Sequence, residues 1–180
     1  MKQLMILRHA QALGVEPGGD DKSRKLSPKG IEDAKALGAL MERQNLQPDL
    51  VLCSAAVRTR QTLDGLLNVI AVGRIDYSDT LYNADFSVLL NAVQGQSNDI
   101  NNLLLVAHNP GIHTFAARLA SDESEQFLIE RLMMSYAPAT MTVLQCDIEN
   151  WADLEVYQNP VLAVHETSAY NSDDRPTRWM

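Results

Sequence analysis

Residues 2–10 read Lys-Gln-Leu-Met-Ile-Leu-Arg-His-Ala, a short apolar run that ends directly on an arginine and a histidine. Two further runs of this kind occupy 50–53 and 103–107. Apolar residues that continue without alternation over so few positions are typical of strands covered on both faces, as in a parallel sheet between helices. Residues 143–144 are a candidate fourth strand.

Between these runs the apolar spacing becomes helical. After Ser27, a suitable N-cap, and Pro28, a suitable first helical residue, one helix face collects Ile31, Ala34, Leu37 and Met41. The same spacing predicts helices over 63–70, 86–93 and 112–119. Strands that alternate with helices predict an α/β protein, a three-layer α/β/α domain with a mostly parallel central sheet.

The bulk composition narrows the class of protein. A chain of 180 residues with 46% apolar composition supports one core, and we expect one domain over 1–164 followed by a polar C-terminal tail over 165–180. The tail's composition favours disorder, while Trp179 leaves open that it docks on the domain or on a partner. A formal charge of −8 argues against nucleic acid or an anionic membrane as the main partner.

The cysteine content and the first residues bear on location. The sequence contains two cysteines, Cys53 and Cys146, and the first ten residues lack the apolar core and cleavage site of a signal peptide. No apolar run approaches the ~20 residues needed to cross a bilayer. We therefore expect a cytoplasmic protein with no membrane partner.

Polar residues follow each of the three apolar runs, where an open α/β sheet binds its ligands. The six residues are Arg8, His9, Ser54, Arg58, His108 and Asn109. Any one of them would be ordinary at the end of a strand, as a surface ion pair, a half-buried ring or a turn residue, so the prediction depends on their coincidence. Guanidinium groups match phosphate oxygens, and an unprotonated imidazole can attack phosphorus. Two histidines and two arginines suffice for phosphoryl transfer without a metal or another cofactor.

These residues resemble the motifs of the histidine phosphatase superfamily, in the stretches 8–10, 54–62 and 106–111. The stretch 21–30 is similar to the short SixA-type phosphohistidine phosphatases. The resemblance implies a phosphoglycerate mutase-like fold and a phosphohistidine intermediate. It further implies roles for named residues: His9 as the nucleophile, Arg8, Arg58 and His108 as catalytic groups that bind the phosphoryl oxygens, and Ser54, Asn109 and Arg24 as further substrate-binding residues.

The sequence departs from the family pattern in two places. Ala10 replaces a glycine, a change we expect to be harmless. Asn83 stands where larger members carry a glutamate general acid, which leaves Asp85 as a candidate for that role, although an aspartate there is also an ordinary helix-start residue. Asn109, where the acid phosphatase and phytase branch has an aspartate, argues against that branch.

Several alternatives remain beside the preferred function, a protein phosphohistidine phosphatase. A zinc site would need His108, His113 and His165 to converge, and a dinucleotide-dependent oxidoreductase would need a glycine-rich turn after the first strand, which this sequence lacks. A small-molecule phosphomonoesterase or a phosphoglycerate mutase-like enzyme would act on small phosphate esters. A non-catalytic phosphate-binding regulator is the alternative from a different class, and sequence alone leaves the physiological substrate open.

Overall fold

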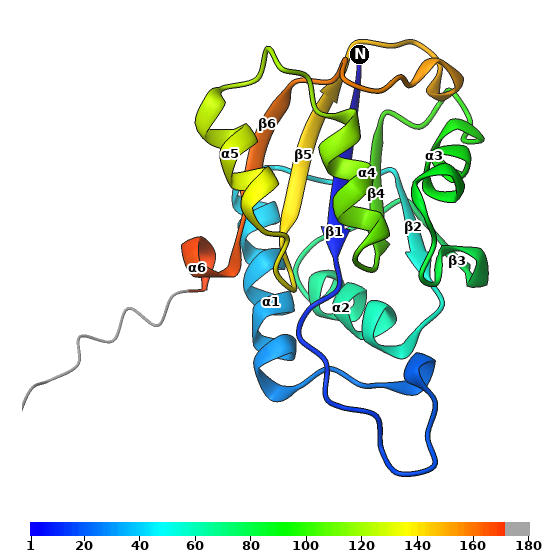
Figure 1. Ribbon diagram of the computed structural model, residues 1–180, viewed down its shortest axis with the longest axis vertical. Coiled ribbons are helices and arrows are strands. Elements are labelled where there is room, and N and C mark those ends of the chain that lie inside the picture. Colours follow the sequence, from blue (N-terminus) through cyan, green and yellow to red (C-terminus); the bar gives the residue numbers. More distant parts are fainter. Residues whose placement is uncertain (172–180) are drawn as a thin grey trace, which may run out of the picture.

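The apolar run at the start of the chain forms an inner strand of a six-stranded sheet in the computed structural model, which describes residues 1–171 (Figure 1). The strand order is β3-β2-β4-β1-β5-β6. The strands are β1 (Lys2–Arg8), β2 (Leu50–Ser54), β3 (Arg74–Ser78), β4 (Asn102–Ala107), β5 (Met141–Cys146) and β6 (Val161–His165). Neighbours among β1 to β4 pair in parallel, and β5 pairs antiparallel with both β1 and β6, so the sheet is mixed but mostly parallel as predicted.

Helices cover both faces of the sheet, which confirms the three layers (Figure 1). Side chains that alternate along the inner strands divide into two apolar clusters, one against α1 and α2 and the other against α3, α4 and α5. The helices are α1 (Pro28–Arg43), α2 (Val57–Leu67), α3 (Phe86–Gln94), α4 (Gly111–Leu119), α5 (Gln126–Met134) and α6 (Thr167–Tyr170), with the short 3-10 helices η1 (Asp21–Ser23), η2 (Asp79–Leu81) and η3 (Trp151–Asp153).

Local chemistry fixes where the helices begin. The side chain of Ser27 accepts a hydrogen bond from the backbone N–H of Gly30, and Pro28 is the first residue of α1, as predicted. Gly111 opens α4 against the segment before α3, where an added Cβ would lie 1.9 Å from the carbonyl oxygen of Ala84. Only a residue without a side chain permits this close approach between the start of α4 and the segment that carries Asn83, a residue that lines a pocket together with His108.

The sequence pattern missed β3, β6 and α5. β3 and β6 are the two edge strands, and most of their side chains are only partly buried or exposed, so neither shows the continuous burial of the inner strands. In α5 the exposed apolar residues Phe127, Met133 and Met134 obscure the buried stripe of Leu128 and Leu132.

The end of the described chain continues beyond the predicted domain boundary. His165 closes β6, and Tyr170 of α6 donates a hydrogen bond from its hydroxyl to the carbonyl oxygen of Ala139 at 2.5 Å. Residues 172–180, including Trp179, lie outside the described residues, so the division at residue 164 stays a prediction. Within residues 1–171, no helix combines the length and the apolar character that crossing a membrane would require.

Candidate active site

The ends of β1, β2 and β4 bring the predicted residues to one edge of the sheet. Because these strands are parallel neighbours, their carboxyl ends coincide, and His9 after β1 lies beside His108 after β4 with ring centroids 5.1 Å apart. Arg58 enters from the first turn of α2, which follows β2. A pocket of about 430 Å³ opens at this edge and is lined by Arg8, His9, Gln11, Ala12, Asp21, Arg24, Arg58, Asn83, His108, Asn109 and Pro138.

The partners of His9 determine its tautomer. Nδ1 lies 2.7 Å from the carbonyl oxygen of Ala10, which can only accept, so Nδ1 carries the proton. Nε2 lies 3.2 Å from Nε of Arg58, which can only donate, so Nε2 presents its lone pair. Burial, followed by the positive charges of Arg58 and Arg8, lowers the pKa of His9 to about 4. At neutral pH His9 therefore holds an unprotonated nitrogen toward the pocket.

His108 is also neutral. Its Nε2 lies 2.8 Å from the hydroxyl of Ser54, while its buried Nδ1 has no hydrogen-bond partner among the described residues. Burial lowers the pKa of His108 to about 3, followed by the positive charge that His9 carries once it is protonated and by the charge of Arg58. Ser54 is buried behind this ring and does not line the pocket, so it orients His108 instead of facing a substrate directly.

The arginines differ in how they are held. Arg8 donates from Nη1 to the carbonyl oxygen of Tyr136 at 2.6 Å, and its buried Nε has no partner among the described residues. Burial lowers the pKa of Arg8 from its ordinary value. Asn109 donates from Nδ2 to the same carbonyl oxygen at 3.0 Å. Both side chains therefore border the pocket through one shared anchor in the segment between α5 and β5.

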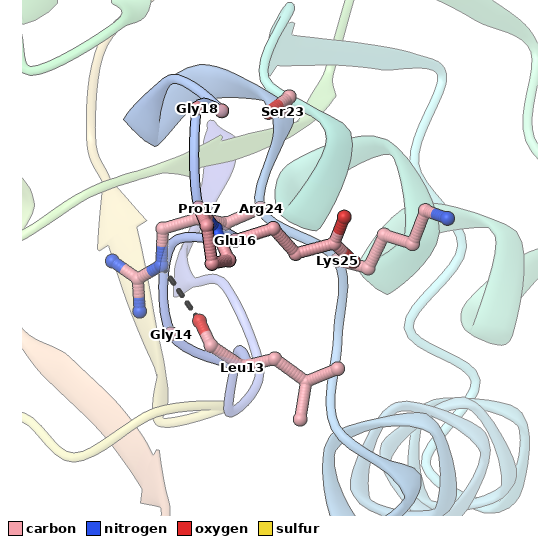
Figure 2. A pocket seen from close by; sticks show the side chains of 9 residues that line it. Leu13, Gly14, Glu16, Pro17, Gly18, Ser23, Arg24 and Lys25 are labelled. Carbon is pink, nitrogen blue, oxygen red and sulfur yellow. Dashed lines mark hydrogen bonds between the residues drawn. The ribbon is translucent and has the colours of Figure 1, made fainter.

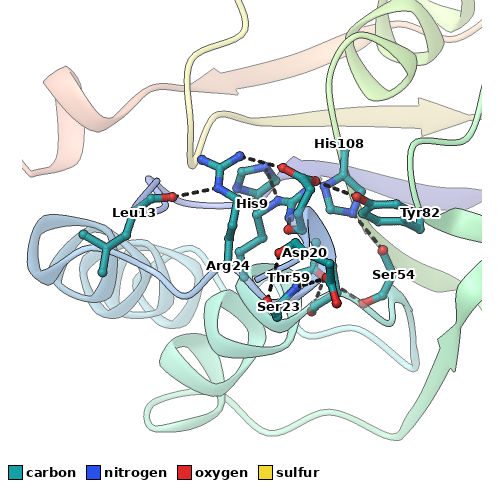
Figure 3. A network of polar contacts seen from close by, with 12 residues as sticks. His9, Leu13, Asp20, Ser23, Arg24, Ser54, Thr59, Tyr82 and His108 are labelled. Carbon is teal, nitrogen blue, oxygen red and sulfur yellow. Dashed lines mark hydrogen bonds and ion pairs between the residues drawn. The ribbon is translucent and has the colours of Figure 1, made fainter. Parts of the chain in front are cut away.

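Asp21 is the site residue that the sequence analysis missed. Its Oδ2 accepts hydrogen bonds from Nη2 of Arg58 at 3.0 Å and from the hydroxyl of Tyr82 at 2.5 Å, and its Oδ1 accepts from Nη1 of Arg24 at 2.9 Å (Figure 3). Its carbonyl oxygen accepts from Nη1 of Arg58 at 2.6 Å. These bonds, those from Tyr82 and Arg24 first, hold the pKa of Asp21 well below its ordinary range. Asp21 opens the short η1 between β1 and α1. The stretch 21–30 is similar to the SixA-type phosphatases, but neither a strand end nor a helix period marks Asp21 as a site residue.

Arg24 links the pocket to a second cavity. It donates from Nε to the carbonyl oxygen of Leu13 at 2.7 Å (Figure 2). The loop around this bond lines a cavity of about 360 Å³. The lining of this cavity is Leu13, Gly14, Glu16, Pro17, Gly18, Gly19, Ser23, Arg24 and Lys25. Arg24 thus lines the main pocket, as the sequence analysis expected of a substrate-binding residue, and closes the neighbouring loop.

The positions proposed to depart from the family pattern have clear structural roles. Asn83 lines the pocket, whereas the carboxylate of Asp85 caps α3 by accepting from the backbone N–H of Val88 at 3.1 Å and from the hydroxyl of Ser87 at 2.7 Å. Asp85 does not line the pocket. Ala10 is buried, and its backbone does not adopt a positive φ, so the replacement of glycine causes no strain there.

The three histidines that a zinc site would need, His108, His113 and His165, have different surroundings in the structure. His113 stacks on Tyr136 with ring centroids 5.2 Å apart, and its Nε2 lies 2.8 Å from the carbonyl oxygen of Leu132. His165 is in β6 at the far edge of the sheet. Within residues 1–171, no cluster of three or more histidine, cysteine, aspartate or glutamate side chains is placed to hold a metal ion.

Comparison with known proteins agrees with this fold. The model of the histidine phosphatase superfamily, branch 1, matches residues 4–89. An uncharacterized protein of Mycobacterium tuberculosis is 31% identical over 150 residues, which cover 83% of this chain and 92% of that protein. A structure described as a candidate phosphohistidine phosphatase SixA from Nakamurella multipartitia is 29% identical, covers 92% of this chain and 95% of its own, and superposes with a TM-score of 0.79. Its counterpart from Agrobacterium tumefaciens is 25% identical. The match covers 92% of this chain and 98% of that chain, with a TM-score of 0.76.

The phosphoglycerate mutase-like α/β fold and these likenesses make the protein a phosphatase, a hydrolase that acts on phosphoric bonds. The chain belongs to the histidine phosphatase superfamily, in its SixA-like branch.

Proposed function

We propose that the protein is a metal-independent phosphatase that removes phosphoryl groups from phosphohistidine in proteins, by way of a phosphohistidine intermediate on His9. The observation that carries this proposal is the tautomer of His9: Nδ1–H is held by the carbonyl oxygen of Ala10, and Nε2 offers its lone pair to the pocket beside Arg58. A nucleophile prepared in this way needs no separate base to remove a proton before it attacks.

The first step moves the phosphoryl group to His9. The lone pair of Nε2 forms a bond to phosphorus while the bond from phosphorus to the substrate nitrogen breaks, and that electron pair returns to the leaving imidazole. Arg8, Arg58 and His108 line the same pocket as His9, which supports a role for them in binding the phosphoryl oxygens. The unpartnered Nε of Arg8 and Nδ1 of His108 are the buried polar atoms in this pocket that a bound phosphoryl group could satisfy.

The second step returns the pocket to its starting state. The oxygen of a water molecule forms a bond to phosphorus, the bond from phosphorus to Nε2 breaks, and the electron pair returns to His9. The proton of the water leaves with inorganic phosphate or with solvent. Because Nδ1–H stays on the carbonyl oxygen of Ala10 throughout, His9 departs as the neutral ring with which the cycle began.

The absence of a suitable acid supports a phosphohistidine substrate. Asp21 is the one carboxylate among the residues that line the described pocket, and its partners keep it ionised. Expulsion of an alkoxide calls for a proton donor, and a positioned acid typically contributes ~10²–10⁴-fold to such a step. An imidazole protonated on its other nitrogen leaves as a neutral ring without that help.

The test compares two substrates with a matched variant. A carrier protein phosphorylated on histidine with phosphoramidate, and separately nitrophenyl phosphate, are incubated with the wild-type protein and with His9→Asn in the presence of excess chelator. We expect wild-type protein to release phosphate from the phosphohistidine protein with the higher kcat/KM, and His9→Asn to release none from either. A higher kcat/KM for nitrophenyl phosphate than for the phosphohistidine protein, or a strict requirement for a divalent ion, would contradict the proposal.

A further inference from the structure

A single ionised carboxylate lies among the cations of the pocket. The residues that line it include three arginines, Arg8, Arg24 and Arg58, and one acid, Asp21. Both imidazoles are neutral because burial lowers their pKa values. A carboxylate in a phosphate pocket repels the bound dianion, so its presence calls for a physical reason.

The residues that line the pocket differ in exposure: the buried ones form its floor, and the more exposed ones lie at its mouth. His9 is 9% exposed and the Arg58 side chain 4%, whereas the side chain of Asp21 is 43% exposed. In-line displacement at phosphorus places the leaving group opposite the nucleophile. Because His9 attacks from the floor, the leaving group departs toward the mouth, where Asp21 lies.

Asp21 is fixed in this position by groups on three separate segments. Arg58 comes from α2, Arg24 follows η1, and Tyr82 follows η2. The ring of Tyr82 also meets the ring of His108 edge-on, with centroids 5.3 Å apart. The carboxylate is therefore held close to the reacting groups instead of swinging freely in solvent.

We propose, on the basis of the function proposed above, that Asp21 determines which leaving group the enzyme accepts: its carboxylate favours a phosphoryl group on a protonated imidazole and disfavours one on an oxygen that becomes anionic. The free ring nitrogen of phosphohistidine, when protonated, donates a hydrogen bond to this carboxylate. In the transition state the departing ring still carries part of its positive charge, which Asp21 stabilises. A phenolate or alkoxide oxygen instead gains negative charge next to Asp21.

Two simpler roles for Asp21 predict different results. If it only orients Arg58, its removal weakens the grip on every phosphoryl group alike. If it only competes with phosphate for Arg58, its removal improves every substrate alike. An effect on the leaving group is the one role in which the two substrate classes change in opposite directions.

The decisive experiment measures kcat/KM of wild-type protein and Asp21→Asn for the phosphohistidine carrier protein and for nitrophenyl phosphate. Since a hydrogen bond to a charged group is lost, we expect kcat/KM for phosphohistidine to fall by about 10- to 100-fold. We expect kcat/KM for nitrophenyl phosphate to rise. Circular dichroism establishes that the variant is folded, and Asp79→Asn is the control, because that exposed aspartate pairs with Lys22 at 2.6 Å and does not line the pocket.

Parallel changes in the two substrates, in either direction, would overturn the role assigned to Asp21. Failure of the proposed function itself has a different signature, because the wild-type protein would then not hydrolyse phosphohistidine, or His9→Asn would retain activity. A second variant, Tyr82→Phe, removes one hydrogen bond from Asp21 but keeps its charge. Tyr82→Phe should therefore preserve the preference for phosphohistidine over nitrophenyl phosphate. If its preference shifted in the same way as that of Asp21→Asn, a role that depends on the charge of Asp21 would be contradicted.

Discussion

Nε of Arg58 donates a hydrogen bond to Nε2 of His9 across 3.2 Å, so the atom we propose as the nucleophile is paired with the atom we propose to grip the phosphoryl group. A phosphoryl group that enters the pocket must part these two side chains. The hydrogen bond from Arg58 thus keeps the lone pair on Nε2 of His9 oriented and unprotonated until a phosphoryl group takes the place of the Arg58 N–H.

The first prediction concerns the covalent intermediate. Brief exposure to labelled phosphohistidine protein should place acid-labile, alkali-stable phosphorus on His9, because its Nε2 is unprotonated and faces the pocket. Mass spectrometry of quenched peptides locates the label. His9→Asn should carry none, and stable label on His108 would reverse the roles of the two histidines.

The second prediction concerns the charge of Arg58. Removal of a preorganised oxyanion donor commonly costs ~10²–10³ in turnover, so Arg58→Ala should lose kcat to that extent. Arg60→Ala is the matched control, because Arg60 lies on the same helix but is exposed and sits over the ring of Tyr77 at 4.7 Å. Similar kcat values for wild-type protein and Arg58→Ala would show that Arg58 does not stabilise the transition state.

The third prediction concerns stability at acidic pH. An unfolded chain protonates His9 near its ordinary pKa of 6.5, whereas the folded protein resists protonation down to a pKa of about 4. Protons therefore favour the unfolded state between these values, and the free energy of unfolding falls as the pH decreases through this window. His9 alone should account for roughly 2–3 kcal/mol between neutral pH and about pH 4.5.

Urea unfolding of wild-type protein and His9→Asn at both pH values isolates this effect. The carboxylates and His108 titrate in both proteins, so the difference between their pH dependences belongs mainly to His9. We expect the variant to lose less stability on acidification. Equal losses would mean that His9 is not held neutral by burial.

The fourth prediction separates capping from catalysis at Asp85. Because its carboxylate accepts from the backbone N–H of Val88 at the start of α3, Asp85→Ala should lower the free energy of unfolding. The same variant should keep its kcat for nitrophenyl phosphate. A collapse in turnover of phosphate esters would identify Asp85 as the general acid and contradict the capping role.

Much of the fold can be predicted from local sequence patterns, such as apolar runs and helix caps. The continuous apolar runs predicted the buried strands β1, β2 and β4, and Ser27 with Pro28 predicted the start of α1. Parallel strands end at a common edge, so the meeting of His9, Arg58 and His108 also followed from the sequence. The edge strands β3 and β6 were not predicted, because partly exposed strands do not show the continuous apolar run that marks a buried strand.

The sequence by itself determined the class of fold, the family and the histidines and arginines of the pocket, because hydrophobic period, caps and strand ends are local properties. Only the tertiary structure decided the tautomer of His9, the capping role of Asp85 and the presence of Asp21 in the site. Asp21 reaches Arg58, 37 positions later, and Tyr82, 61 positions later, through irregular segments. Such segments have no period, and their contacts depend on the path that the packed sheet and helices impose on the chain between them.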